Sequence, residues 1–302
     1  MYGRILVPLD GSELAEQVLP YVSFLSQKLQ SPIQLLQVLA PVPQELIDSA
    51  HGSYPHRVAE GQRSHAQDYL DRVAGQLRES GLLVQGATQE GEPAQIIVSE
   101  AERDPDTLIA LCTHGRTGIT RWTMGSVADK VLHAVSVPLL LIRAGEQPVS
   151  NAAAMLNRVI VPLDGSELAE GILPYVTPLA LGLGLQVTLL RVTASPEEYL
   201  RFMDYPVGDY AALARDVDAL AVDYLKEIKA RLTREGVPNV EERLAHGHAA
   251  NAIIDLAQNT PNNLVAMGTH GRSGFGRWLL GSVTDQVVRH SNDPVLVVRP
   301  GP

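Results

Sequence analysis

Two glycine-rich stretches hold the residues best suited to chemistry. Residues 267–285 read MGTHGRSGFGRWLLGSVTD, and residues 112–129 read CTHGRTGITRWTMGSVAD. Glycine has no Cβ, so backbone N–H groups in such a stretch can approach a ligand closely. Each stretch passes through Gly-Ser where a helix is expected to begin, and a helix N-terminus offers unpaired N–H donors and a positive dipole. With Arg272 adding positive charge, we expect each stretch to bind a phosphate group.

A tight turn followed by a capped helix is the alternative interpretation of each stretch. Ser282 and Asp285 fit the Ser-x-x-Asp pattern of a helix cap. The stretch occurs twice, however, and each copy follows an apolar run in the corresponding half of the chain. This repetition favours phosphate binding over an ordinary turn.

Two carboxylates follow the first apolar run of each half. Asp10 and Asp164 both lie in the sequence Val-Pro-Leu-Asp-Gly-Ser-Glu. Such a carboxylate could accept a hydrogen bond from the base of a nucleotide, or it could belong to a turn or a helix cap. Ser12 and Ser166 are equally good cap residues. Beside a phosphate-binding stretch, the nucleotide interpretation is favoured.

The sequence provides no clear catalytic set. His114 and His270 are conceivable bases, but no acidic residue lies near them in the sequence, and a positioning role is favoured. Trp122 and Trp278 are interpreted as packing residues. The P-loop, protein-kinase, zinc and hydrolase-elbow motifs are all absent. We therefore assign neither catalytic residues nor a metal site, although Mg²⁺ could accompany bound phosphates.

The composition argues against nucleic acid and membranes as partners. The 302 residues carry a formal net charge of −10, with 24 Lys and Arg against 34 Asp and Glu, and an acidic surface repels phosphate backbones and anionic lipids. The single cysteine cannot form an internal disulfide, which suits a reducing compartment. The N-terminus shows no signal-peptide pattern. We expect a cytoplasmic protein.

A duplication organises the chain. Residues 4–22 and 158–176 are identical at 15 of 19 positions, and the glycine stretches and the closing apolar runs also recur. Ala, Gly, Pro and Ser are frequent between the halves, as in a linker. We expect a domain at 1–144, a linker at 145–157 and a second domain at 158–302.

Short apolar runs alternate with amphipathic segments in each half, which predicts α/β domains. Each is expected to be a doubly wound, Rossmann-like fold with a five-stranded parallel sheet and helices on both faces. Pro20 should kink the first helix. Ligands of such sheets bind beyond the carboxyl ends of strands, so the loops after strands one and four are candidates. The expected strands of the first half are 4–9, 33–39, 83–88, 107–111 and 138–143; the expected helices are 13–29, 58–79, 94–103 and 126–135, with 210–235 in the second half.

These residues resemble the universal stress protein family, here as a tandem of two domains. The family pattern G-x2-G-x9-G-[ST] is matched in full by Gly268, Gly271 and Gly281-Ser282. In the first half the later positions match, but Cys112 replaces the first glycine. The Val-Pro-Leu-Asp opening and the closing apolar run are similar too, so the resemblance spans both halves.

The resemblance implies two ATP sites in a stress-response regulator without dedicated catalytic machinery. In nucleotide-binding members, adenine lies against the Asp after strand one and a Val at the end of strand two, and the glycine loop holds the ribose and phosphates. Pro162, Leu163, Asp164, Val192, Met267, Gly268, His270, Gly271, Arg272, Gly281, Ser282 and Val283 would form the second site. Pro8, Leu9, Asp10, Val38, Cys112, His114, Gly115, Arg116, Gly125, Ser126 and Val127 would form the first.

Two other functions remain open. A nucleotide-independent scaffold could work through the closing strands, 137–143 and 293–299, which could pair the two halves as a pseudo-dimer or two chains as a homodimer. A slow ATP hydrolase using His270 is the other alternative. If the position of Cys112 needs a positive φ, its Cβ costs roughly 1 kcal/mol or more; if the position is extended, a small Cys could be tolerated there, since only the N–H matters. We therefore expect the second site to bind at least as tightly as the first.

Overall fold

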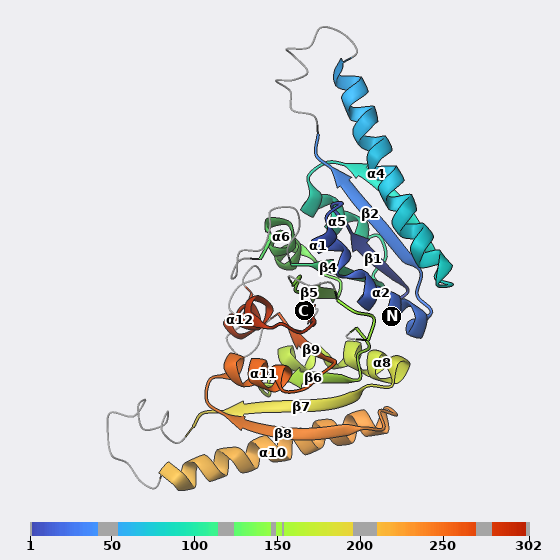
Figure 1. The fold of residues 1–302 in the computed structure, drawn as a ribbon. Helices are drawn as coiled ribbons and strands as arrows, with labels where there is room; N and C mark the ends of the chain where they lie inside the picture. Colours follow the sequence, from blue (N-terminus) through green and yellow to red (C-terminus); the bar gives the residue numbers. More distant parts are fainter. Residues whose placement is uncertain are drawn as a thin grey trace. The chain divides into compact units, whose positions relative to one another are not determined.

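The chain divides into two compact units, residues 1–154 and 155–302, in the computed structural model (Figure 1). The structure describes residues 2–41, 54–113, 124–145, 149–152, 154–195, 210–269 and 280–299. Each unit is an α/β fold, as the alternation of apolar and amphipathic segments predicts.

The first unit contains one parallel sheet with the strand order β3-β2-β1-β4-β5. Helix α4 packs on β2 and β3, and α5 packs on β2 and β4 beside α6 (Figure 1). The strands are β1 (Arg4–Pro8), β2 (Ile33–Leu39), β3 (Val84–Glu90), β4 (Thr107–Cys112) and β5 (Leu139–Ile142). The helices are α1 (Glu13–Glu16), α2 (Leu19–Leu29), α4 (Tyr54–Glu79), α5 (Pro93–Ala101) and α6 (Ser126–Ala134).

The second unit repeats this arrangement with the strand order β8-β7-β6-β9-β10, again parallel. Helix α10 packs on β7 and β8, and α11 packs beside α12. The strands are β6 (Arg158–Pro162), β7 (Gln186–Thr193), β8 (Val240–His246), β9 (Asn263–Gly268) and β10 (Val295–Val298). The helices are α7 (Glu167–Glu170), α8 (Leu173–Leu183), α10 (Tyr210–Arg234), α11 (Ala249–Gln258) and α12 (Ser282–His290).

The central strands are apolar on both faces because helices cover both. All residues of β4 and β9 are buried, as expected for parallel strands between two helical layers. In each unit the strand order reverses between the first and fourth strands. The carboxyl ends of these two strands therefore border a crevice in which ligands of such folds bind.

The expected single helix at 13–29 is wrong. The chain forms two helices there, α1 and α2, and Pro20 lies in the first turn of α2. A proline in a first turn removes only an N–H that has no intrahelical acceptor, so it starts a helix where we had expected a kink. Ser12 caps α1 as expected, since its side chain accepts a hydrogen bond from the Ala15 N–H. The predicted strand at 33–39 matches β2 at both ends, and the other predicted elements of the first half differ from the observed ones by at most four residues at an end.

The segment between the units is partly packed. Ala154 and Leu156 are buried, and the N–H of Asn157 donates to the carbonyl of Asn262 at 2.9 Å. Leu156 and Asn157, at the end of the predicted linker, thus belong to the second unit, while the domain boundaries at 144 and 158 stay a prediction. Among the described residues, none of the helices has the length and apolar character needed to cross a membrane.

Candidate functional site

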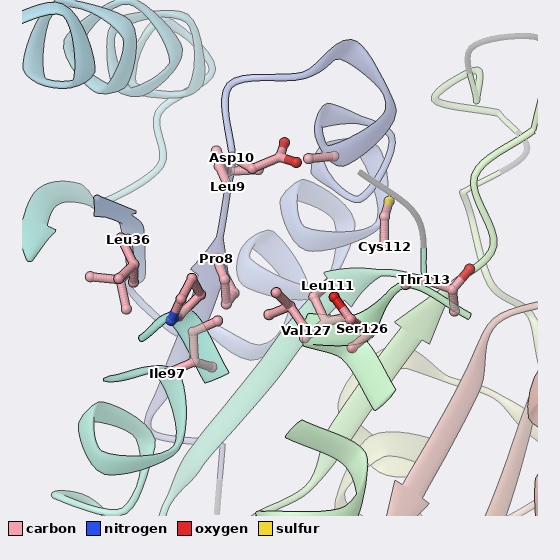
Figure 2. A pocket seen from close by; sticks show the side chains of 15 residues that line it. Pro8, Leu9, Asp10, Leu36, Ile97, Leu111, Cys112, Thr113, Ser126 and Val127 are labelled. Carbon is pink, nitrogen blue, oxygen red and sulfur yellow. The ribbon is translucent and has the colours of Figure 1, made fainter. Parts of the chain in front are cut away.

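Each unit has a pocket of about 210 Å³ at the carboxyl ends of its first, second and fourth strands. In the first unit, Leu36 and Val38 of β2 and Ile97 of α5 contribute apolar walls. Figure 2 shows Asp10 and Cys112 at one end of this pocket and Ser126 and Val127 near its other side. The pocket thus joins an apolar slot to the start of a helix.

Most predicted site residues line these pockets. In the second unit they are Pro162, Leu163, Asp164, Val192, Met267, Gly268, Gly281, Ser282 and Val283. In the first unit they are Pro8, Leu9, Asp10, Val38, Cys112, Gly125, Ser126 and Val127. The remaining predicted residues, namely His114, Gly115, Arg116, His270, Gly271 and Arg272, lie outside the described residues. The role of all of them in binding stays a prediction.

Sequence reasoning missed part of the lining. Leu36 and Leu190 lie two residues before the predicted valines and therefore share their face of the strand, so this pair could have been found. The lining residues from α5 and α11 could not have been found, because the spacing of apolar residues along a helix does not show which strand ends the helix faces. The missed residues are Ala15, Leu36, Pro93, Ile97, Leu111, Thr113 and Ala128 in the first unit, and Ala169, Leu190, Ala249, Ile253 and Thr284 in the second.

Asp10 and Asp164 each close a tight turn at the rim of a pocket. Oδ1 of Asp10 accepts hydrogen bonds from the N–H of Ser12 at 3.0 Å and from its hydroxyl at 2.6 Å. Asp164 makes the same two bonds with Ser166, at 3.0 and 2.6 Å. The turn and the pocket are therefore compatible roles, because each carboxylate stabilises its turn and also lines the cavity.

The glycine between each Asp and Ser makes this turn feasible. Gly11 and Gly165 have φ values of 85° and 80°. Residues with a Cβ rarely adopt this left-handed conformation. The Asp-Gly-Ser sequence is thus explained by local backbone geometry in both units.

Helices α6 and α12 begin at the pockets without a side-chain cap. Gly125 and Gly281 are the N-cap residues, and their backbone N–H groups donate to the carbonyls of Thr113 and Thr269. The expected capping role of Ser282 is wrong, because Ser282 is the first helical residue. A glycine N-cap leaves no side chain over the first turn, whose N–H groups have no intrahelical acceptors. This end of the pocket suits an anion.

The Asp285 carboxylate, expected to complete the cap, instead accepts a hydrogen bond from Nε of Arg289 at 2.7 Å. These residues are four apart, so they face each other along α12. The acidic side chain is thereby directed along the helix surface. It does not compete for the N-terminal N–H groups.

The Cys112 thiol in the first pocket is held neutral. Burial raises the pKa of this thiol to about 12, and the carboxylate of Asp10 also raises it, while a hydrogen bond with the Val18 backbone lowers it. Figure 2 shows its sulfur directed toward the side of the pocket where Asp10 lies. A neutral thiol adds no charge to the pocket.

The described residues include no group of three or more His, Cys, Asp or Glu side chains arranged to hold a metal ion. The pockets therefore offer apolar walls, one carboxylate and a helix N-terminus. Such a combination suits a flat, partly apolar molecule that carries an anionic group.

The chain was compared with known families and structures. The model of the universal stress protein family matches residues 1–143 and 155–299. A universal stress protein of Mycolicibacterium smegmatis is 26% identical over 306 residues, covering 99% of this chain and 97% of that protein. One from Synechocystis is 24% identical over 315 residues, covering 98% and 99%.

The arrangement of the chain is also found in a solved structure. A universal stress protein of Archaeoglobus fulgidus superposes with a TM-score of 0.71 and 23% identity, covering 100% of both chains. This likeness shows a common fold.

Proposed function

Because the chain belongs to the universal stress protein family, we propose that each unit binds an adenine nucleotide, specifically ATP, and that the protein acts as a nucleotide-dependent regulator of the stress response. The observation that carries this proposal is the pair of glycine-capped helices, α6 and α12, whose N-termini open into apolar pockets. The pockets provide separate places for a base and for phosphates.

In the second unit, the adenine would lie between the apolar side chains of Val192 and Ile253, near Asp164. The phosphates would lie at the first turn of α12, where Ser282 can add a hydroxyl donor. The residues of the glycine stretch that the structure does not describe would also bind the phosphates. The first unit would use Val38, Ile97 and Asp10 with α6 in the same way.

We propose neither a dedicated catalytic step nor a metal site for the protein itself. A Mg²⁺ ion would enter only with the phosphates of the nucleotide. We also propose a cytoplasmic location, with association as a homodimer or between the two halves. Nucleic acid and membranes are not among the proposed partners.

The first prediction concerns bound nucleotide. Protein purified without added nucleotide and then denatured should release an adenine nucleotide, detected by chromatography and mass spectrometry, and the emptied protein should bind added ATP in calorimetry. Absence of both would contradict the proposal and leave the scaffold alternative.

The second prediction concerns the helix N-termini. Gly281→Glu places a carboxylate where the phosphates would lie and should abolish binding at the second pocket, and Gly125→Glu should do so at the first. Gly61→Glu is the matched control, because it adds the same side chain on α4, where a Cβ meets nothing within 4 Å. Calorimetry should give one site in each pocket variant and two in the control. Two intact sites in the pocket variants would overturn the assignment.

A further inference from the structure

We propose that the pocket of the second unit binds an adenine nucleotide more tightly than the first, and that Arg191 and Thr284 are the positioning residues responsible. This inference rests on the proposed function and deepens it. Neither residue belongs to the glycine pattern. Both act on the backbone around the pocket.

Among the described residues, the parts of the two pockets expected to contact the ligand directly are closely similar. The cavities have the same volume, about 210 Å³. The Asp turns have the same hydrogen bonds at the same distances. Within the part of the chain that the structure describes, a difference in affinity therefore comes from the few substituted positions or from the residues that support the pocket.

Arg191 supports the strand that carries the pocket's carboxylate. It lies on β7 between Leu190 and Val192, which line the pocket, so its side chain points to the opposite face of the sheet. There its Nη1 donates to the carbonyl of Leu163 at 3.2 Å. Leu163 lines the pocket and directly precedes Asp164. Arg191 thus fixes the backbone from which that carboxylate projects.

A network behind the sheet holds Arg191 itself. Its guanidinium lies 5.9 Å from the ring centroid of Tyr224 on α10, within the range of a cation–π contact. The hydroxyl of Tyr224 donates to Glu170 at 3.1 Å, and Arg231 donates to the same carboxylate at 3.0 Å. The support therefore reaches from α10 through β7 to the loop after β6.

In the first unit the corresponding cation lies elsewhere. Gln37 occupies the position of Arg191, between Leu36 and Val38, and its Oε1 is buried without a hydrogen-bond partner among the described residues. The cation over the equivalent ring, Tyr69, is Arg72 of α4, at 5.2 Å. Arg72 pairs with Glu16 at 2.9 Å, and half of its side chain is exposed. The arginine over the ring thus belongs to the helix in the first unit and to the strand in the second.

Thr284 supports the other end of the second pocket. Its hydroxyl donates to the carbonyl of Gly268 at 2.9 Å, and this bond is buried. It joins the first turn of α12, where the phosphates would lie, to the end of β9. In the first unit Ala128 has no hydroxyl to make such a bond, and Cys112 adds a side chain at the position of Gly268.

Both differences favour the second pocket. A site whose backbone is already fixed loses less conformational freedom when the ligand binds, so more of the interaction energy appears as affinity. A single hydrogen bond of this kind changes an equilibrium by about three- to tenfold. We expect a difference of that size for each of the two residues.

The test uses the full chain with ATP as the probe. Gly125→Glu leaves only the second pocket and Gly281→Glu only the first, so calorimetry on each gives the Kd of one pocket. The Gly125→Glu protein should bind ATP at least about tenfold more tightly than the Gly281→Glu protein, because the two contributions multiply. Equal affinities would overturn the inference, whereas loss of all ATP binding by the unmodified protein would contradict the proposed function itself.

The positioning residues are then tested in each background. In Gly125→Glu protein, Arg191→Gln and Thr284→Ala should each raise the Kd about three- to tenfold, and Thr284→Ser, which keeps the hydroxyl, should restore it. In Gly281→Glu protein the same changes should leave the Kd of the first pocket unchanged. A general loss of folding would affect both pockets and the unfolding transition, so circular dichroism and urea unfolding accompany each variant.

If Arg191→Gln fails to fold, the Thr284→Ala and Thr284→Ser variants still test the role of Thr284. An unchanged Kd at the second pocket in Thr284→Ala overturns the role of that residue. Failure of Thr284→Ser to restore the Kd also overturns it.

Discussion

The thiol of Cys112 and the backbone of Gly268 occupy corresponding ends of β4 and β9. In one unit a side chain is buried beside Asp10, and in the other the strand ends without a Cβ. The sequence shows this substitution directly. Its chemical meaning comes from the structure, because the pKa of the Cys112 thiol is raised by burial and by the Asp10 carboxylate. Asp10 is near Cys112 in the fold but far from it in the sequence.

A third prediction follows for this thiol. Because burial raises the pKa of this thiol to about 12, far less of it is ionised at pH 8 than of an ordinary cysteine. Alkylation by iodoacetamide in the native protein should therefore be at least about a hundredfold slower than in urea, measured by mass spectrometry over time. Equal rates in the two conditions would show that the thiol is neither buried nor neutral.

At the scale of elements, the sequence predicted the fold well because it depends on repeated local patterns. The strands alternate with amphipathic helices, and Asp-Gly-Ser encodes its own turn. Pro20 and Ser282 were misinterpreted because a proline or serine near a helix start fits more than one position of the first turn. The contacts of Arg191 with Leu163 and of Thr284 with Gly268 join separate elements, so no period or motif reveals them.

Helix α5 shows how the two units differ in such contacts. Glu100 is 4% exposed and accepts hydrogen bonds from Gln34 at 3.0 Å, Gln89 at 3.0 Å and Arg103 at 2.6 Å. Arg4 of β1 lies 3.4 Å away. Burial raises the pKa of this carboxyl group, but the hydrogen bonds and cations together lower it by more. The pKa of Glu100 therefore lies below its usual value.

In the second unit the equivalent arginine has an acidic partner on a different element. Arg158 of β6 pairs with Glu241 of β8 at 2.6 Å, and α11 has Leu256 at the position of Glu100. The acid that pairs with this arginine therefore lies on a helix and is buried in the first unit, whereas in the second unit it lies on an edge strand and is partly exposed. The arginine at the start of the first strand is the common feature.

A fourth prediction tests Glu100. Glu100→Gln should destabilise the first unit by about 1 to 3 kcal/mol at pH 7, because it removes the charge of a buried carboxylate that accepts several hydrogen bonds. Since the folded-state pKa is lowered, the stabilisation is present above the unfolded-state value and is lost as the pH falls through the folded-state value. The deficit measured by urea unfolding should therefore shrink below about pH 4.

Glu102→Gln is the matched control for this experiment. It makes the same chemical change two residues away on an exposed side chain, where effects are usually within about 0.5 kcal/mol. A similar loss of stability in both variants would contradict the special role of Glu100.

At the scale of the whole molecule, the duplication gives two compact units, each with its own core and pocket. A ligand that binds only the folded state stabilises the unit that holds it. At a free concentration one hundred times the Kd, this stabilisation is about 2.7 kcal/mol. Each unit should respond to its own site.

A fifth prediction follows from this linkage. In the unmodified protein, ATP should slow hydrogen exchange in the cores of both units, measured by mass spectrometry of peptides from β4 and β9. In Gly281→Glu the slowing should be confined to the first unit, and in Gly125→Glu to the second. Gly61→Glu again serves as the control and should behave like the unmodified protein. Slowing of both units in either pocket variant would show that the sites are not independent.

Among the described residues, only the second pocket has the backbone hydrogen bonds of Arg191 and Thr284. This difference affects how the occupancy of the two sites would change with ATP concentration. Two identical sites would have the same occupancy at every ATP concentration. Sites whose Kd values differ by about tenfold or more fill at different concentrations, so the singly filled chain holds its nucleotide mainly in the second unit. Divergence at Arg191 and Thr284 would thus widen the range of ATP concentration over which the occupancy of the duplicated chain changes.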